Sequence, residues 1–304
     1  MRCFLCVATV CASAFSFASF DLILVTDFAE DCVHRYDGDT GVYLGSFGQA
    51  FLDGPKAISL DQANNMVVVE HVNGTSAFNY NTGTHLFTSV VFANSGDSTF
   101  IGSTYFRTIG SVSTSAVGRI TNIQTSTSQS IHNGSVVGPW SGIASDVNGK
   151  VFAVESTSGR VLRWTPGITA AEEAISGTTV IRSGLGSTGG FILGLGATGE
   201  MVSVNSTSMA VATGTVPLGT AWTSAIDAAA GHGSSAWGLG MTAGGAIIQS
   251  YAKHPTTNLY RGLNRISATQ MTTPSAMVVV VAPEPSAMLG LGVAVLALLR
   301  RRQK

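Results

Sequence analysis

Three acidic residues at equivalent places in a repeated pattern are the clearest candidates for chemistry in this 304-residue chain. Glu70 and Glu155 each end a Val-rich segment, and Asp27 ends an apolar segment of the same kind. Carboxylates that separate segments bring to one face can hold a calcium ion or bind a sugar. No other feature predicts a cofactor, so Ca²⁺ is the cofactor that such a site would hold. Alternatively, the three acids satisfy backbone N–H groups or an arginine of the next unit.

Other reactive residue types give weaker signals. The six histidines form no HxxxH or HxH spacing, and the chain lacks a nucleophile elbow, a phosphate loop and a dinucleotide fingerprint. Asp37-Gly-Asp-Thr-Gly41 lacks the third ligand and the distal Glu of an EF-hand, and it is interpreted as a hairpin turn.

Cys32 is predicted to be a buried strand residue. Exposed tryptophans could stack sugars, although Trp164 is expected in the core; the four are Trp140, Trp164, Trp222 and Trp237.

The elements that position these residues repeat along the chain. Segment 58–70 aligns with 143–155 at an offset of 85, and 36–44 aligns with 78–86 at an offset of 42. Segment 27–36 aligns with 155–164 at an offset of 128. These offsets are close to one, two and three times a single period, which is the period of a four-stranded propeller blade.

The chain is therefore predicted to be all-β, a β-propeller most consistent with six four-stranded blades, with five or seven remaining open. Five units are expected to start near Gly54, Ser98, Gly138, Gly189 and Ser234. Residues 22–48 supply three strands of a sixth unit, and 276–281 supply its missing first strand. Strands from both ends would then close the ring and remove its exposed edges.

The pattern resembles the NHL-type propeller repeat. Its markers here are a Gly-Pro pair, an Asn- or Gly-containing turn, a Val-rich strand ending in an acid, and an Arg-Val-aromatic strand. They are clearest in 54–86 and 138–164. The resemblance implies a propeller domain over 19–282, with sites expected at the mouth of the central channel.

The N-terminus predicts a signal peptide over residues 1–18. Arg2 gives a positive start, Cys3 to Phe17 are largely apolar, and Ser16-Phe17-Ala18 places small residues at the positions that signal peptidase requires. Removal of this segment leaves Cys32 as the single cysteine. The mature domain can then form no internal disulfide.

The C-terminus, 283–304, has three parts. Pro283-Glu284-Pro285-Ser286 precedes an apolar stretch, predicted as a transmembrane helix over 286–299, and Arg300, Arg301 and Arg302 follow as a membrane stop. This tail resembles the PEP-CTERM sorting signal of bacteria. The resemblance implies an exosortase-type processing enzyme as a partner, inner-membrane anchoring before processing, and delivery to the cell surface or the extracellular space, often with exopolysaccharide.

Charge limits the remaining functions. Residues 19–282 hold 11 of the 16 Lys and Arg and 16 of the 17 Asp and Glu, a net charge of about −5, which argues against nucleic acid as a partner. Two functions remain open. The favoured one is a non-catalytic binding or structural protein associated with extracellular polysaccharide or a surface protein; the other is a metal-dependent, lactonase-like hydrolase or lyase.

Overall fold

The computed structural model describes residues 21–281, apart from 90–94, 103, 112–113, 123–126, 134–139, 156–158, 166–172, 175–180, 189, 215–220, 234 and 258. The predicted signal peptide and the sorting motif with its 286–299 helix lie outside these residues. Within the described ranges, no helix is long and apolar enough to cross a membrane.

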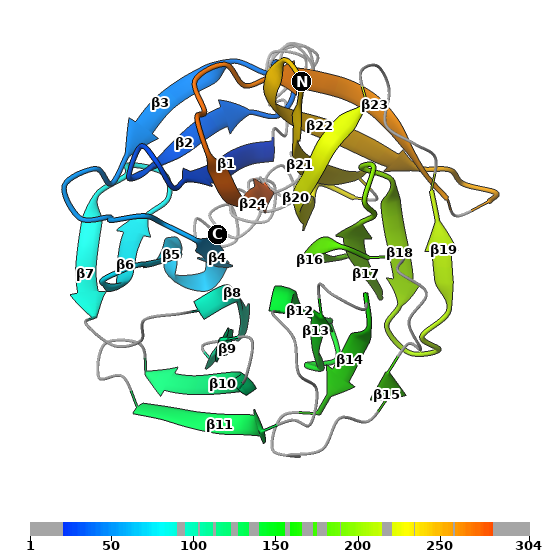
Figure 1. Ribbon diagram of the computed structural model, residues 1–304, viewed down its shortest axis with the longest axis horizontal. Helices are drawn as coiled ribbons and strands as arrows, with labels where there is room; N and C mark the ends of the chain where they lie inside the picture. Colours follow the sequence, from blue (N-terminus) through cyan, green and yellow to red (C-terminus); the bar gives the residue numbers. More distant parts are fainter. Residues whose placement is uncertain are drawn as a thin grey trace, which may run out of the picture.

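The β-propeller prediction is confirmed. The described strands pair into six antiparallel four-stranded sheets around a central axis (Figure 1). From the axis outward, the first three sheets are β24-β1-β2-β3, β4-β5-β6-β7 and β8-β9-β10-β11. The other three are β12-β13-β14-β15, β16-β17-β18-β19 and β20-β21-β22-β23.

The bounds of the strands follow the repeat. Those of the first three sheets are β24 (Pro274–Val281), β1 (Asp21–Asp27), β2 (Cys32–Asp37), β3 (Tyr43–Phe47), β4 (Ala57–Asp61), β5 (Met66–His71), β6 (Gly74–Asn79), β7 (His85–Ser89), β8 (Ser95–Ile101), β9 (Thr104–Ser111), β10 (Thr114–Asn122) and β11 (Thr127–Asn133). Those of the other three are β12 (Trp140–Ser145), β13 (Val151–Glu155), β14 (Val161–Trp164), β15 (Glu173–Ala174), β16 (Ser183–Thr188), β17 (Phe191–Leu195), β18 (Met201–Asn205), β19 (Val211–Thr213), β20 (Trp222–Ala230), β21 (Ser235–Thr242), β22 (Gly245–Lys253) and β23 (Tyr260–Ser267). A 3-10 turn, η1 (Gln62–Asn64), joins β4 to β5.

The two ends of the described chain meet in the first sheet. β24 pairs antiparallel with β1, so that Leu24 lies opposite Val278 and Asp21 opposite Val281. The segment predicted to supply the missing inner strand, 276–281, lies in β24. The ring is thus closed by strands from opposite ends of the sequence.

The predicted turns are present. Asn65 and Gly149 adopt positive φ in the two inner hairpins, and Gly41 does so in the outer one. The Asp37 carboxylate accepts backbone N–H groups from Asp39 and Thr40, which confirms 37–41 as a hairpin turn.

The phasing of the last two units was wrong. Units were predicted to start near Gly189 and Ser234, but residues 191–204 and 236–249 form the second and third strands of their sheets, β17–β18 and β21–β22. The true inner strands, β16 and β20, are rich in Ser, Thr, Gly and Ala. A Cβ at Gly186 would lie 2.9 Å from the Ala229 Cα, so close packing at the axis favours small residues. Strands built mainly of Gly, Ala and Ser lack the bulky β-branched and aromatic composition by which a strand is usually recognised.

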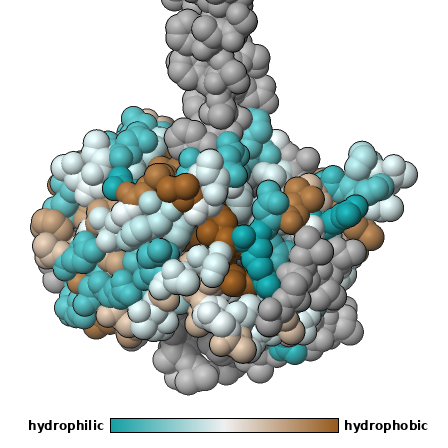
Figure 2. Space-filling view, turned by 90° about the horizontal axis from the view of Figure 1, so that it is seen from above, coloured by the Kyte–Doolittle hydropathy of each residue, from teal (hydrophilic) through white to brown (hydrophobic). Residues whose placement is uncertain are grey.

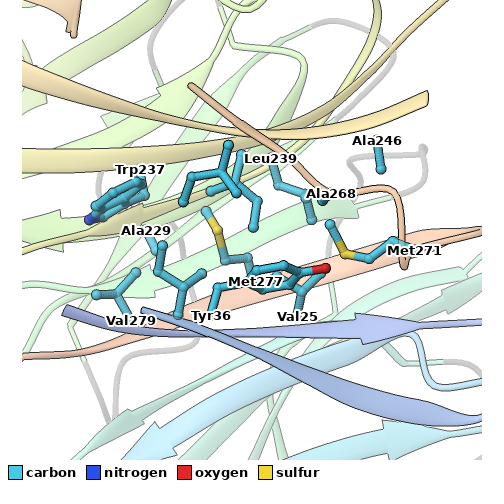
Figure 3. Close-up of a cluster of buried hydrophobic side chains, with 13 residues drawn as sticks. Val25, Tyr36, Ala229, Trp237, Leu239, Ala246, Ala268, Met271, Met277 and Val279 are labelled. Carbon is cyan, nitrogen blue, oxygen red and sulfur yellow. The ribbon is translucent and has the colours of Figure 1, made fainter. Parts of the chain in front are cut away.

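The core consists of clusters between neighbouring sheets. Figure 3 shows the one at the seam, where Val25 and Tyr36 of the first sheet meet Trp237 and Leu239 of the sixth, with Met277 of β24 between them. Each of these side chains is nearly inaccessible to solvent. Burial between sheets therefore holds the ring together, since each sheet supplies apolar surface to both neighbours.

Candidate functional site

The inner strands of all six sheets surround a central cavity of about 240 Å³. Its apolar lining comes from residues such as Ile58, Leu185 and Val279, and its polar side chains are Ser59, Asp97, Ser98, Thr99, Ser145, Ser187 and Asp227. Two carboxylates stand out among them, because both are almost completely buried.

Asp97 links the third sheet to the fourth. It lies where the β8–β9 register shifts between Ser95 and Ser98. One carboxylate oxygen accepts the backbone N–H of Ser98 at 2.8 Å, and the other accepts that of Ile143 on β12 at 2.8 Å. Asp97 therefore acts as a clamp between two inner strands.

Asp227 repeats this arrangement between the sixth and first sheets. It also lies at a register shift, between Ala225 and Asp227. Its carboxylate accepts the N–H of Ala228 at 2.7 Å and that of Met277 on β24 at 2.7 Å. A Cβ at Gly184 of the adjacent strand would overlap this carboxylate, so only glycine fits there.

Burial shifts the protonation of this pair. It raises the pKa of Asp227 from 3.8 to about 7, against the opposing effect of the two backbone donors. Burial, followed by the negative charge of Asp227, holds the pKa of Asp97 well above its usual range. The pair therefore resists carrying two negative charges near neutral pH. Because all four carboxylate oxygens already accept backbone N–H groups, the arrangement is suited to holding the ring rather than to catalysis.

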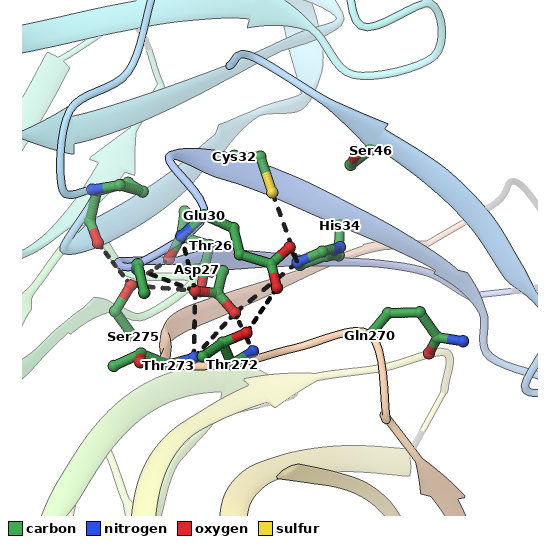
Figure 4. A network of polar contacts seen from close by, with 12 residues as sticks. Thr26, Asp27, Glu30, Cys32, His34, Ser46, Gln270, Thr272, Thr273 and Ser275 are labelled. Atoms are coloured by element: carbon green, nitrogen blue, oxygen red, sulfur yellow. Dashed lines mark hydrogen bonds and ion pairs between the residues drawn. The ribbon is translucent and has the colours of Figure 1, made fainter.

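The three acids predicted at the channel face do not line the described cavity. Asp27, Glu70 and Glu155 occupy the same end of β1, β5 and β13 but are not among the residues that line the described cavity. The Asp27 carboxylate accepts N–H groups from Ala29, Glu30, Thr272 and Thr273 (Figure 4). It thus satisfies the backbone of the β1–β2 turn and of the segment before β24.

Glu70 joins the second sheet to the third. It accepts a hydrogen bond from the Tyr105 hydroxyl and pairs with Arg107 at 3.3 Å, and all three side chains are inaccessible to solvent. Glu155 is buried at the end of β13, opposite Trp140 of β12. In the described part of the chain the three acids form no group within metal-ligand distance of one another. For Asp27 and Glu70 the contacts favour the alternative of backbone or arginine partners.

The prediction for Cys32 is confirmed, whereas the one for the tryptophans is wrong. Cys32 is buried in β2, as predicted, and burial together with the nearby Glu30 and Asp27 raises the pKa of its thiol to about 12. All four tryptophans are at most 7% exposed. The idea that they stack sugars was therefore wrong, because their large rings fill the spaces between sheets and beside the inner strands.

The exposed aromatic surface comes instead from phenylalanine. Phe28 and Phe51 are 42% and 47% exposed, and Val72 is 41% exposed. Phe28 follows β1, Phe51 lies in the β3–β4 loop and Val72 lies in the β5–β6 turn, so all three are on one face of the ring, here called the loop face. The Phe51 ring stacks on His85 with centroids 3.8 Å apart and an interplanar angle of 2°.

The loop face is opposite to the face where both terminal segments leave. β1 begins at Asp21 and β24 ends at Val281, and these two residues pair with each other. Gln62, in the β4–β5 connection of this opposite face, donates to the Val281 carbonyl at 3.2 Å. A side view shows apolar residues in small groups among hydrophilic ones (Figure 2). The chain after Val281 therefore starts on the face opposite to the loop face.

Similarity to known proteins is structural. No family model matches the chain, and no curated protein matches it. A chain from the crystal structure of a nidogen/laminin complex has a TM-score of 0.63 at 10% identity, over 85% of this chain and 98% of that one. A protein of unknown function from Bacteroides caccae has a TM-score of 0.63 at 8% identity, over 86% and 99% of the two chains. A chain of Kuenenia stuttgartiensis hydrazine synthase has a TM-score of 0.56 at 13% identity, over 83% and 84%. At these identities the similarity shows the β-propeller fold alone.

Proposed function

We propose that this chain is an exported, surface-displayed β-propeller that binds extracellular polysaccharide without catalysis. The signals at 1–18 and 283–304 support export and processing by an exosortase-type enzyme. A chain from the crystal structure of a nidogen/laminin complex has a similar fold, which is compatible with a binding role for this propeller.

The observation that carries the binding proposal is the orientation of the loop face. The tail begins beyond Val281, on the opposite face of the ring. A chain held at a membrane by residues 286–299 would therefore present Phe28, Phe51 and Val72 away from that membrane. Exposed aromatic surface in a fixed position is typical of a recognition site.

The chemistry of this face suits a sugar polymer. Phe51 offers a flat apolar ring whose orientation is fixed by stacking on His85. Polar groups lie in the same loops: the Asn73 amide, in the turn that carries Val72, donates to the exposed Asp53 carboxylate of the β3–β4 loop at 2.5 Å. An aromatic face together with carboxylate and amide groups can contact both the C–H and the hydroxyl groups of a sugar.

The proposal predicts a loss of binding on substitution of the aromatic ring. Phe51→Ala should weaken retention of the full chain at least about tenfold, a loss of about 1.4 kcal/mol. The measurement is affinity electrophoresis in gels containing polysaccharide extracted from the cells that produce the protein. Val147→Ala is the control, because Val147 is 78% exposed but lies in the β12–β13 turn of the opposite face.

Equal retention of the wild type and Phe51→Ala would overturn the role of the loop face. Absence of any retention of the wild type would overturn polysaccharide binding itself, and surface display would then stand on the terminal signals alone.

A further inference from the structure

The β1–β2 hairpin brings three metal-ligating side chains of different types together. Cys32 and His34 are two residues apart on β2 and therefore share one face of the strand, while Glu30 lies in the preceding turn (Figure 4). Their ligand atoms all lie within 4.8 Å of one another. Glu30 is 39% exposed, whereas His34 is 2% exposed, so the cluster is enclosed but open at one side.

The distances fit one small cation. The Cys32 Sγ lies 3.5 Å from the His34 Nε2, and that nitrogen lies 3.5 Å from the Glu30 Oε2. Tetrahedral Zn²⁺ with bonds of about 2.0–2.3 Å separates its ligand atoms by roughly 3.3–3.8 Å. Two of the three separations thus match a tetrahedral ion, and the third, between the Cys32 Sγ and the Glu30 carboxylate, is at most 4.8 Å, which the partly exposed Glu30 side chain can shorten.

Neighbouring groups already orient two of the ligands. The His34 Nδ1 lies at 3.2 Å from the Tyr43 hydroxyl, which leaves Nε2 directed at the cluster. Thr272 donates from its hydroxyl to the Glu30 Oε1 at 2.6 Å, which leaves Oε2 free to face His34. Such outer contacts are the usual support of metal-bound histidines and carboxylates.

Asp27 adds charge rather than a ligand. Its Oδ2 lies 3.8 Å from the His34 Nε2, but both of its oxygens accept backbone N–H groups. Its negative charge in a buried position favours a cation nearby.

We propose that Glu30, Cys32 and His34 form a Zn²⁺ site with a fourth position open to solvent beside Glu30. The Cys32 thiol gives its proton to water on binding, and the resulting thiolate and the Glu30 carboxylate balance the charge of the ion. Through Thr272, the site connects the β1–β2 hairpin to the segment before β24. Zinc therefore stabilises the ring at the seam where its two ends meet. This inference is independent of polysaccharide binding.

The test is metal binding by the full chain in which Cys3, Cys6 and Cys11 are replaced by serine. Cys32 is then its only thiol. After equilibration with Zn²⁺ and removal of excess metal, elemental analysis should find one zinc per chain. Replacement by Co²⁺ should give intense visible bands of tetrahedral geometry and a near-ultraviolet thiolate-to-cobalt band.

Variants locate the site. Cys32→Ser should abolish the thiolate band and weaken Zn²⁺ binding at least about 100-fold, and Glu30→Gln should weaken it at least about tenfold. Glu30 is partly exposed, so Glu30→Gln keeps the fold even if Cys32→Ser does not. His254→Gln, at an exposed histidine, should change neither readout.

Failure to retain zinc stoichiometrically, a cobalt spectrum without the thiolate band, or unchanged affinity in Glu30→Gln would each overturn the proposal.

Discussion

Arg107→Ala should lower the free energy of unfolding by about 3–5 kcal/mol, because it removes one partner of a buried ion pair. Arg107 and Glu70 are inaccessible to solvent, and their side chains meet at 3.3 Å between the second and third sheets. The variant leaves the Glu70 carboxylate buried without this countercharge. Urea unfolding followed by tryptophan fluorescence measures the loss, since the tryptophans become exposed when the ring opens.

A double variant separates the charge from the packing. Glu70→Gln combined with Arg107→Leu removes both charges and keeps an acceptor for the Tyr105 hydroxyl, and it should recover more than half of the stability lost in Arg107→Ala. A loss below about 1 kcal/mol in Arg107→Ala would contradict the assignment of this pair as a structural link between sheets.

The central pair of aspartates should make stability fall as pH rises. Burial raises the pKa of Asp227 from 3.8 to about 7, so between these values the folded chain holds a proton that the unfolded chain has released. The stabilisation is complete below the unfolded pKa and is lost as pH rises through the folded one. At about 1.4 kcal/mol per pH unit, the change attributable to Asp227 alone is on the order of 4 kcal/mol.

Comparison with Asp227→Asn removes from the measurement every titration except those of the two coupled aspartates, Asp97 and Asp227. An asparagine side chain has one oxygen in place of two, so one of the backbone N–H groups of Ala228 and Met277 loses its acceptor. This cost does not depend on pH. The stability of the wild type minus that of Asp227→Asn should therefore decrease steadily from about pH 4 to about pH 8. Ser187→Ala, another cavity residue, should show the pH dependence of the wild type. A difference that is flat or rises with pH would mean that Asp227 is ionised throughout.

The fold was predictable because its signal is periodic. The Val-rich strands at 66–69 and 151–154, and the turns at 61–65 and 146–150, recur at twice the blade period. The position of 276–281 as an inner strand followed from the first unit lacking one. The phase of the later blades was not predictable from this pattern, since the inner strands β16 and β20 consist largely of small residues, and the more apolar strand pairs that follow them resemble the start of a unit.

The polar sites were harder to predict, because they depend on contacts between sheets. Asp97 and Asp227 stand 130 residues apart, close to three periods, and this recurrence could have marked them as equivalent. The pairing of Cys32 with His34 was not predicted, because HxxxH and HxH spacings reveal only pairs of histidines. On a strand, a Cys-x-His spacing also directs both side chains to one face.

The central claim, that a propeller is exported and released from its tail at the cell surface, is tested most directly by the termini of the natural protein. Mass spectrometry of the surface fraction should find a chain that begins at Ser19 and ends near Pro283 to Ser286. A protein recovered from the cytosol that begins at Met1 and ends at Lys304 would contradict it.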